Sequence, residues 1–435
     1  MSKMKIFVRQ AAVLSVSNGA TRALGFVMRV ALSRRLGAEG TGVLELASSA
    51  HMLWIAPVTA GLPMAVSTET AAGRGGEALH AGRRLALRVS LLMLPALFVF
   101  SPLIARLLGD ARTLPALWCY LPCLPVLGLS AVYNGWCYGA GDTLPPAASE
   151  LTEQALRFAL CMGLLTVFPR MRAAYTAAVP ALSTLLGEGA GLLLVVWMLK
   201  KQGTLPAGRA SAETEKKLWR LSAPMTWMRL SNTLTRTAGA VLIPLRLRAA
   251  GLSAQEATAR LGMLSGMAMP WVMLPGVFTG ALAVVAGPAI ARRRNSPEML
   301  RALAVRLIAA ALAISAPLAL LLSFGAPFLA NVVYRQADVG PLLKQLAPLA
   351  PLCGAQQVLS GILTGMEMQR SLLASSLSGS LLTLVLDFFL VKKFRLAGCA
   401  LARLAGHGLT LYMNLCAFSA ELRKRRDAPT PPLKG

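Results

Sequence analysis

The sequence predicts an all-α polytopic membrane protein with about twelve transmembrane helices, arranged as two parallel repeats of six helices. Three observations support this fold class. The chain has 435 residues, of which 55% are hydrophobic and only 14% are charged, whereas soluble domains have roughly 25% charged residues. Apolar stretches of ~20 residues, long enough to cross a bilayer, follow one another along the whole chain. Two sequence motifs of the first half recur in the second half.

The apolar stretches define the expected membrane spans. Six lie on each side of a polar stretch that is rich in glycine, proline and charge. We therefore expect an N-terminal lobe at 1–201, a cytoplasmic linker at 202–216, a C-terminal lobe at 217–423 and a basic cytoplasmic tail at 424–435. The expected spans are 10–33, 42–68, 85–106, 114–139, 145–168 and 174–199 in the first half, and 219–245, 260–290, 300–324, 343–365, 371–391 and 397–420 in the second.

The repeat is visible in two places. The pattern S-N-x-x-T-R-x-x-G begins at Ser17 and again at Ser231, an offset of 231 − 17 = 214. In the fourth and tenth expected helices, prolines and glycines match from Pro122 and Pro348 onward, at 348 − 122 = 226. Matching helices lie six spans apart, and six is even. The two halves therefore share one orientation and are related by an axis along the membrane normal.

The net charge of +26 does not indicate nucleic-acid binding, because the basic residues lie in short clusters between apolar stretches and not along one solvated face. Such clusters are typical of the cytoplasmic ends of membrane helices and of contact with anionic lipids. Their distribution favours a multi-pass membrane protein with both termini in the cytoplasm. We expect a monomer.

Four arginines are the main candidates for substrate binding, since an arginine in an apolar helix is costly and indicates a functional role. Arg22 and Arg236 match through the repeat, while Arg29 and Arg229 lie seven residues, or two helical turns, from them. Guanidinium groups bind phosphate oxygens with two parallel hydrogen bonds, so these arginines indicate an anionic, phosphorylated substrate. Alternatively, Arg29 and Arg229 reach the membrane interfaces and Arg22 and Arg236 bind helix carbonyls.

Four other polar residues have two interpretations each. Asn18 and Asn232 lie one turn before the matched arginines and either bind the substrate or join helices by hydrogen bonds. Glu153 either couples transport to a proton or cation, or is neutralised by Arg157 four residues later. Asp387 either has a coupling role or is held by the two lysines at the end of its helix.

Catalysis and cofactor binding find no support in the sequence. It contains no nucleophile–base arrangement, no phosphate-binding loop and no metal-ligand spacing, and it has only three histidines. The seven cysteines all have apolar surroundings, which argues against a zinc site. We expect neither an enzyme nor a cofactor or metal.

The segments 34–42 (RRLGAEGTG), 60–67 (AGLPMAVS), 134–139 and 391–398 (VKKFRLAG) resemble the stage V sporulation protein B (SpoVB) family. This family belongs to the polysaccharide-export branch of the multidrug/oligosaccharidyl-lipid/polysaccharide (MOP) transporter superfamily. The resemblance extends over nearly the whole chain. It implies a two-lobed helical fold that flips undecaprenyl-pyrophosphate-linked glycans, such as peptidoglycan precursors, across the plasma membrane.

Residues 22–26 (RALGF) also resemble the first helix of lipid II flippases of the MurJ family, in which an arginine lines the cavity. This resemblance supports Arg22 alone, because the second-helix arginines of those flippases have no counterpart between Met52 and Gly61. SpoVB relatives typically have fourteen helices, against about twelve here.

Two other functions remain open. A cation-coupled multidrug exporter of the same superfamily (MATE type) would have an acidic residue on the first helix, and none lies between Val8 and Leu32. A non-transporting scaffold in envelope or spore assembly would not need the arginines. A membrane glycosyltransferase is disfavoured, because no sizeable acidic loop lies outside the expected spans.

Overall fold

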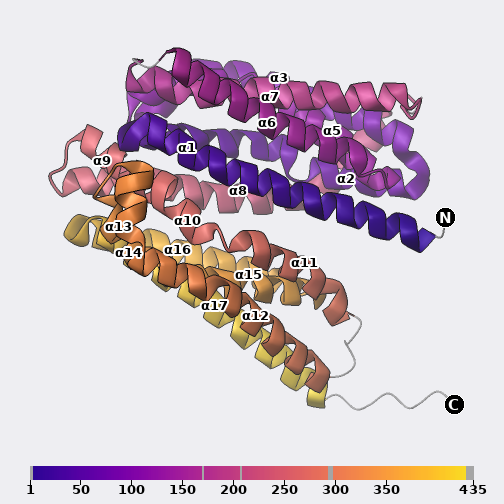
Figure 1. The fold of residues 1–435 in the computed structure, drawn as a ribbon. Coiled ribbons are helices and arrows are strands. Elements are labelled where there is room, and N and C mark those ends of the chain that lie inside the picture. Colours follow the sequence, from indigo (N-terminus) through magenta and orange to yellow (C-terminus); the bar gives the residue numbers. More distant parts are fainter. Residues whose placement is uncertain (1–2, 169–170, 206–207, 292–296, 428–435) are drawn as a thin grey trace. The chain divides into compact units, whose positions relative to one another are not determined.

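The computed structural model describes residues 3–168, 171–205, 208–291 and 297–427, all of whose regular elements are helices (Figure 1). The side chains of 3–16, 18, 284, 285, 287–289, 291 and 427 lie outside this description. The chain forms two compact units, Met1–Met267 and Ala268–Gly435, which we describe separately as unit 1 and unit 2.

Unit 1 contains the helices of the first expected lobe and the first two helices of the second. Its elements are α1 (Lys3–Thr59), α2 (Leu62–Glu69), η1 (Thr70–Arg74), α3 (Gly75–Leu107), η2 (Ala111–Thr113), α4 (Leu114–Tyr120), α5 (Cys123–Ala140), α6 (Leu144–Val167), α7 (Ala173–Lys201), α8 (Ala212–Ala249), α9 (Ala254–Leu261) and the π-helical turn η3 (Gly262–Ala268).

Unit 2 contains the remaining helices. Its elements are α10 (Met269–Met273), α11 (Gly276–Ala291), α12 (Pro297–Phe324), α13 (Ala326–Phe328), η4 (Leu329–Tyr334), α14 (Val339–Leu346), α15 (Leu349–Gly365), α16 (Gln369–Phe394) and α17 (Leu396–Asp427).

Helix α1 is a hairpin of two helices that join at Gly37, whose backbone is not helical (φ 68°, ψ −177°). Arg29 and Glu45, eight residues before and after Gly37, form an ion pair. In a straight helix they would lie about 24 Å apart, so the chain must fold back. The two parts correspond to the first two expected spans. Helix α8 also ends next to a glycine with positive φ, Gly251 (φ 91°), at the repeat offset of 251 − 37 = 214.

The second repeated motif produces the same geometry in both units. Helices α4 and α5 are bent by 43° at a break that contains Pro122, and α14 and α15 by 44° at a break that contains Pro348. Proline causes such bends because it lacks an N–H group and collides with the preceding turn. A Cβ atom at Gly135 or Gly361 would lie 2.8 Å from a Cα atom of α2 or α11, respectively. The fold class with its two repeats is thereby confirmed.

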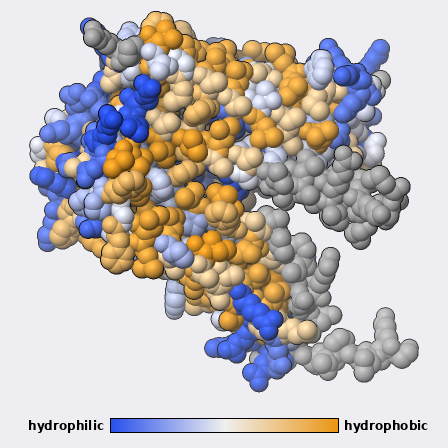
Figure 2. All heavy atoms as spheres, in the orientation of Figure 1, coloured by the Kyte–Doolittle hydropathy of each residue, from blue (hydrophilic) through white to orange (hydrophobic). Residues whose placement is uncertain are grey.

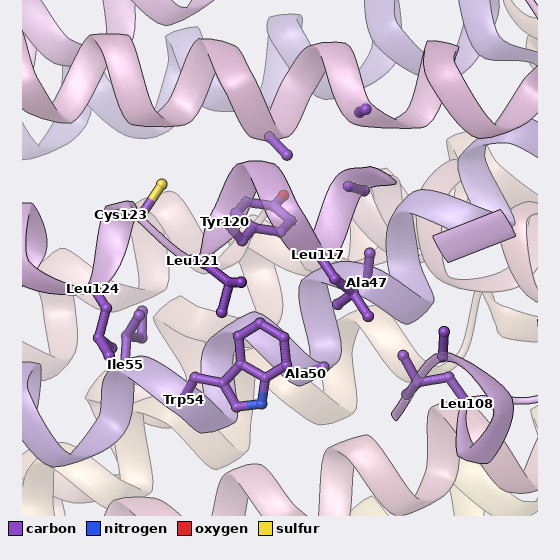
Figure 3. Close-up of a cluster of buried hydrophobic side chains, with 14 of the residues drawn as sticks. Ala47, Ala50, Trp54, Ile55, Leu108, Leu117, Tyr120, Leu121, Cys123 and Leu124 are labelled. Atoms are coloured by element: carbon purple, nitrogen blue, oxygen red, sulfur yellow. The ribbon is translucent and has the colours of Figure 1, made fainter. Parts of the chain in front are cut away.

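An apolar cluster in unit 1 lies between α1, α4 and α5 (Figure 3). Trp54 of α1 lies near Leu117 of α4, Leu121 in the turn that follows α4, and Leu124 of α5, all buried. Tyr120 is in the same cluster and is 5% exposed. Since lipid is as apolar as these side chains, close packing and not removal from water holds the helices together.

The protein is a multi-pass membrane protein. Among the described residues, four helical stretches are long and apolar enough to cross a membrane, or up to seven if each of three bent pairs is one span. One of the four, Gly19–Leu107, contains both parts of α1 together with α2 and α3. Helices α6, α8 and α17 fall outside this set, and they carry charged side chains. Apolar residues cover most of the face in Figure 2, with hydrophilic residues gathered at helix ends.

The contact-based units differ from the expected lobes in one respect. Helices α8 and α9 pack against α1, so unit 1 extends to Met267, whereas the expected first lobe ends at residue 201. Helix α8 also begins at Ala212, inside the expected linker 202–216. The lobes were defined by the repeat and not by contacts, and they stay a prediction. Helix α17 reaches Asp427, and the rest of the expected tail lies outside the described residues.

Candidate functional site

Helix α8 runs antiparallel to the second part of α1, and two contacts fix their register. At one end Gly61 approaches the carbonyl group of Ser222 so closely that a Cβ atom would collide with it. Farther along, the Thr237 hydroxyl donates to the Ser49 carbonyl at 3.0 Å. From residue 222 to 237 of α8, the neighbouring position therefore moves from Gly61, two residues after the end of α1, back to Ser49 within α1.

This register gives the relative depths of the two matched arginines, both of which are exposed. Arg236 precedes Thr237, so it lies level with about residue 50 of α1. Arg22 lies seven residues before Arg29, whose partner is Glu45. Across the hairpin it is level with about residue 52, since 45 + 7 = 52. Two residues of helix correspond to about 3 Å, so Arg22 and Arg236 lie at nearly the same depth.

Arg29 and the two candidate arginines of α8 differ in their partners. Arg29 forms an ion pair with Glu45 and also donates to the carbonyl oxygen of Ser265 at 3.1 Å. Arg229 and Arg236 are exposed, and within the described part of the chain their guanidinium groups have no hydrogen-bond or ion-pair partner. The two arginines of α8 are therefore open to a ligand, whereas Arg29 is held by an acid that the sequence did not single out.

The two candidate asparagines are described unequally. Asn232 is half-buried in α8, one turn before Arg236. Asn18 lies in α1, but its side chain is outside the described residues. Its role stays a prediction.

Unit 1 also contains a buried cluster with two acidic side chains. The ion pair expected between Glu153 and Arg157 is present, and Arg157 also contacts Glu188 of α7 at 3.2 Å. These side chains are 14%, 17% and 10% exposed. Gly187 allows the approach, since a Cβ atom there would lie 2.9 Å from the Glu153 carbonyl oxygen. One guanidinium group thus faces two carboxyl groups inside the membrane.

His51 extends this cluster toward α1. Its ring stacks on Tyr120 at a centroid distance of 4.0 Å, and the Tyr120 hydroxyl lies 3.2 Å from that of Ser48. Buried His51 has no hydrogen-bond partner at Nδ1 among the described residues. The sequence did not identify this group, because its members come from α1, α4, α6 and α7 and follow no local pattern.

Polar contacts tie α9 to the turn of the α1 hairpin. Arg112 contacts both Glu39 and Asp110, Gln255 donates to Glu39 at 2.7 Å, and Thr258 donates to Asp110 at 3.0 Å. Burial raises the pKa of the Asp110 carboxyl, but hydrogen bonds from the Arg112 side chain and backbone outweigh it and hold this pKa below its ordinary value. These contacts join helices of the two repeats.

The opposite end of unit 1 has a second set of charged contacts. Glu215, near the start of α8, forms ion pairs with Arg84 and Arg88 of α3. Lys217 contacts Glu69 at 2.9 Å. The segment from α8 to η3 is therefore held to first-repeat helices at both ends, and its two open arginines lie between.

In unit 2, Asp387 lies 3.9 Å from Arg403 of α17. The expectation that the lysines at the end of its helix hold it is wrong, because the carboxyl group faces the next helix. The two residues lie equally far from the turn residue Arg395 (φ 51°), since 395 − 387 = 8 and 403 − 395 = 8. The ion pair in α1 has the same spacing about its own turn. Opposite charges equally spaced about a helical turn are a signal that could have identified both pairs.

Within the described ranges, no group of three or more His, Cys, Asp or Glu side chains could hold a metal ion. The nearest approach of a thiol to an imidazole that the structure describes is in unit 2, where Cys353 lies 3.6 Å from Nδ1 of His407. The amide oxygen of Gln356 accepts a hydrogen bond from the same nitrogen at 2.8 Å, so this ring links α15 and α17.

Residues 7–294 match the family described as polysaccharide biosynthesis protein. The chain belongs to this family. It is 28% identical over 438 residues to stage V sporulation protein B of Bacillus subtilis (strain 168), with 96% of this chain and 84% of that protein covered. Family membership confirms the resemblance drawn from the sequence motifs.

Solved structures show the same fold. An inward-facing multidrug resistance MATE family transporter of the MOP superfamily has a TM-score of 0.80 and 15% identity, covering 95% of this chain and 96% of that chain. The lipid II flippase MurJ in an inward closed conformation has a TM-score of 0.74 and 14% identity, covering 94% and 89%. The chain thus belongs to the polysaccharide biosynthesis protein family and has the fold of these transporters.

Proposed function

We propose that this protein flips an undecaprenyl-pyrophosphate-linked glycan, a peptidoglycan precursor or polysaccharide unit, across the plasma membrane by alternating access. The observation that carries the proposal is the pair Arg22 and Arg236. The two arginines match through the repeat, are exposed at nearly the same depth, and lie on helices that pack together. Arg236 has no acidic partner among the described residues.

A pyrophosphate group fits this pair chemically. For Arg236, which has no partner among the described residues, a mid-membrane position costs ~3 kcal/mol or more, and a ligand that carries several negative charges offsets that cost. The planar guanidinium group binds two phosphate oxygens at once. Asn18 and Asn232, one turn before each arginine, are proposed to bind further polar groups of the ligand. Arg229 is proposed to bind the ligand as it enters the site.

The related proteins support the substrate class. The family description refers to polysaccharide biosynthesis, and a neighbour of the same fold is a lipid II flippase. We take the lipid-linked anionic glycan as the substrate and anionic membrane lipids as the surrounding partners. The active form is proposed to be a single chain with both termini in the cytoplasm.

The energy source is proposed to act through buried carboxyl groups. Glu153 shares Arg157 with Glu188, and Asp387 lies near Arg403 in unit 2. In each case a proton or cation that neutralises a carboxyl group would weaken a buried ion pair. The packing of the helices that this pair joins would then change. Glu153 and Asp387 are thus candidates for coupling, together with Glu188.

A multidrug exporter is the second candidate, favoured by the similarity to MATE structures and by the buried acidic cluster. The two functions differ in the charge of the substrate. The test is transport in vesicles reconstituted with the full chain, with lipid II and a cationic drug measured in parallel. Flipping of lipid II without drug transport supports the proposal. Drug transport without lipid flipping contradicts it, and neither activity would favour a scaffold.

A further inference from the structure

Arg29 connects three parts of unit 1. Its Nη2 atom contacts a carboxylate oxygen of Glu45 across the α1 hairpin and the carbonyl oxygen of Ser265 at 3.1 Å. One turn later on α1, the Ser33 hydroxyl donates to the carbonyl oxygen of Gly266 at 3.0 Å. Two side chains one turn apart on α1 thus donate hydrogen bonds to two consecutive carbonyl groups of η3.

The π-helical geometry of η3 explains why these carbonyl groups accept bonds from α1. A π-helical turn bonds residue i to i+5, so it departs from the hydrogen-bond ladder of an α-helix, and such turns are frequent at functional sites. Gly266 also lies so close to Thr41 that a Cβ atom would collide with its side chain. Because η3 belongs to the second repeat and α1 to the first, this contact ties the two repeats together.

The charges allow a ligand to compete for this tie. Arg29 is 45% exposed and Glu45 is 20% exposed, so an anion can reach the guanidinium group without unfolding. A carboxylate brings one negative charge to Arg29, whereas a pyrophosphate brings several and more acceptor oxygens. A weakly charged ligand therefore does not displace the Glu45 carboxylate from Arg29.

We propose that Glu45 is a resident counter-ion of Arg29, which a pyrophosphate-bearing ligand displaces, and that this displacement releases Arg29 from Ser265. The inference rests on the proposed function and adds a residue that determines specificity. Glu45 selects ligands by charge, and the release of η3 links ligand binding to separation of the two repeats.

The test is a binding cycle on the full chain in nanodiscs, with inorganic pyrophosphate as the probe and acetate as the singly charged comparison. The proteins are the wild type, the single variants Glu45→Gln, Arg29→Gln and Arg22→Gln, and the double variant Glu45→Gln, Arg29→Gln. Removing the competing carboxylate should strengthen pyrophosphate binding about tenfold and allow measurable acetate binding. Arg29→Gln should weaken pyrophosphate binding, and in that background Glu45→Gln should have no further effect.

Glu421→Gln is the matched control, because Glu421 forms an ion pair with Arg425 in unit 2 and its loss changes the net charge equally. It should leave both affinities unchanged. Unchanged or weaker pyrophosphate binding in Glu45→Gln overturns the inference, as does an effect that persists without Arg29. Binding that falls in Arg22→Gln but does not rise in Glu45→Gln contradicts this inference alone. No pyrophosphate binding by any of these proteins contradicts the proposed function as well.

Discussion

The Thr237 hydroxyl of α8 donates a hydrogen bond to the backbone carbonyl of Ser49 in α1, at 3.0 Å. Thr237 follows Arg236 directly, and Ser49 lies one turn from Glu45. The bond therefore sets the depth of the second-repeat arginine against the first-repeat hairpin. Most hydroxyl groups of α8 bond within their own helix, as Thr233 does with the Arg229 carbonyl, so this bond between helices is specific to the register.

The repeat predicts that substituting either of two matched glycines destabilises the protein by a similar amount. Gly135→Ala and Gly361→Ala should each lower the melting temperature of the protein by a similar amount, because each new Cβ atom would collide with a neighbouring helix backbone. Gly189→Ala is the control, since nothing lies within 4 Å of a Cβ atom there. It should stabilise its helix slightly. Melting curves in detergent would contradict the account if Gly135→Ala and Gly189→Ala behaved alike.

The order of helices could be predicted from the sequence because the signal is local. Apolar stretches mark the membrane helices, and Pro122 and Pro348, which match through the repeat, lie at the two bends. The positions of helix ends were less certain, because a cap and ion pairs can extend a helix beyond its apolar stretch. Helix α8 begins at Ala212, where the Ser211 hydroxyl accepts from the Thr214 N–H at 3.0 Å, and Glu215 in its first turn pairs with Arg84 and Arg88.

The candidate site could be predicted only in part. Arg22 and Arg236 stand out because a repeat and an apolar context are both visible in the sequence. The ion pairs Arg29–Glu45 and Asp387–Arg403 each form across a hairpin turn, at Gly37 and Arg395 respectively. Each pair becomes evident only when the position of its turn is known.

The buried cluster gives a prediction about stability. Arg157→Met should destabilise the protein by about 3–5 kcal/mol, because it leaves Glu153 and Glu188 buried without a cation. The triple variant Glu153→Gln, Arg157→Met, Glu188→Gln should recover most of that loss, since no charge remains to be compensated. Melting temperature and the amount of protein in the membrane measure both effects. A triple variant no more stable than Arg157→Met would show that the charges do not determine the cost.

The pH dependence of stability follows from Asp110. Because its pKa is lowered in the folded protein, its ionised form contributes stability that is present above the unfolded pKa near 4 and is lost as the pH falls through the lower folded value. Asp110→Asn should therefore cost roughly 1–3 kcal/mol at pH 7. The difference from wild type should shrink below about pH 4. Melting curves of both proteins across this range test it, and a difference independent of pH would count against the Arg112 contact.

The orientation predicts opposite accessibility for two exposed positions. A cysteine at Gln202, between α7 and α8, should be protected from an impermeant thiol reagent in intact cells. A cysteine at Ala111, at the other end of unit 1, should be labelled. The background should carry Cys416→Ser, because Cys416 is the exposed native thiol of the described residues. Labelling in the reverse pattern would place both termini outside the cytoplasm.

The central claim is that Arg22 and Arg236 bind the pyrophosphate of a lipid-linked glycan. The most direct measurement is the rate of lipid II flipping in vesicles that contain the double variant Arg22→Ala, Arg236→Ala. The amount of variant protein in the membrane is first confirmed to equal that of the wild type. Hydrogen bonds to charged groups contribute roughly 1.5–3 kcal/mol each, so the account predicts that flipping falls about tenfold or more. Arg425→Ala, which removes an arginine from the tail helix, should flip at the wild-type rate. A wild-type rate in the double variant would contradict the account.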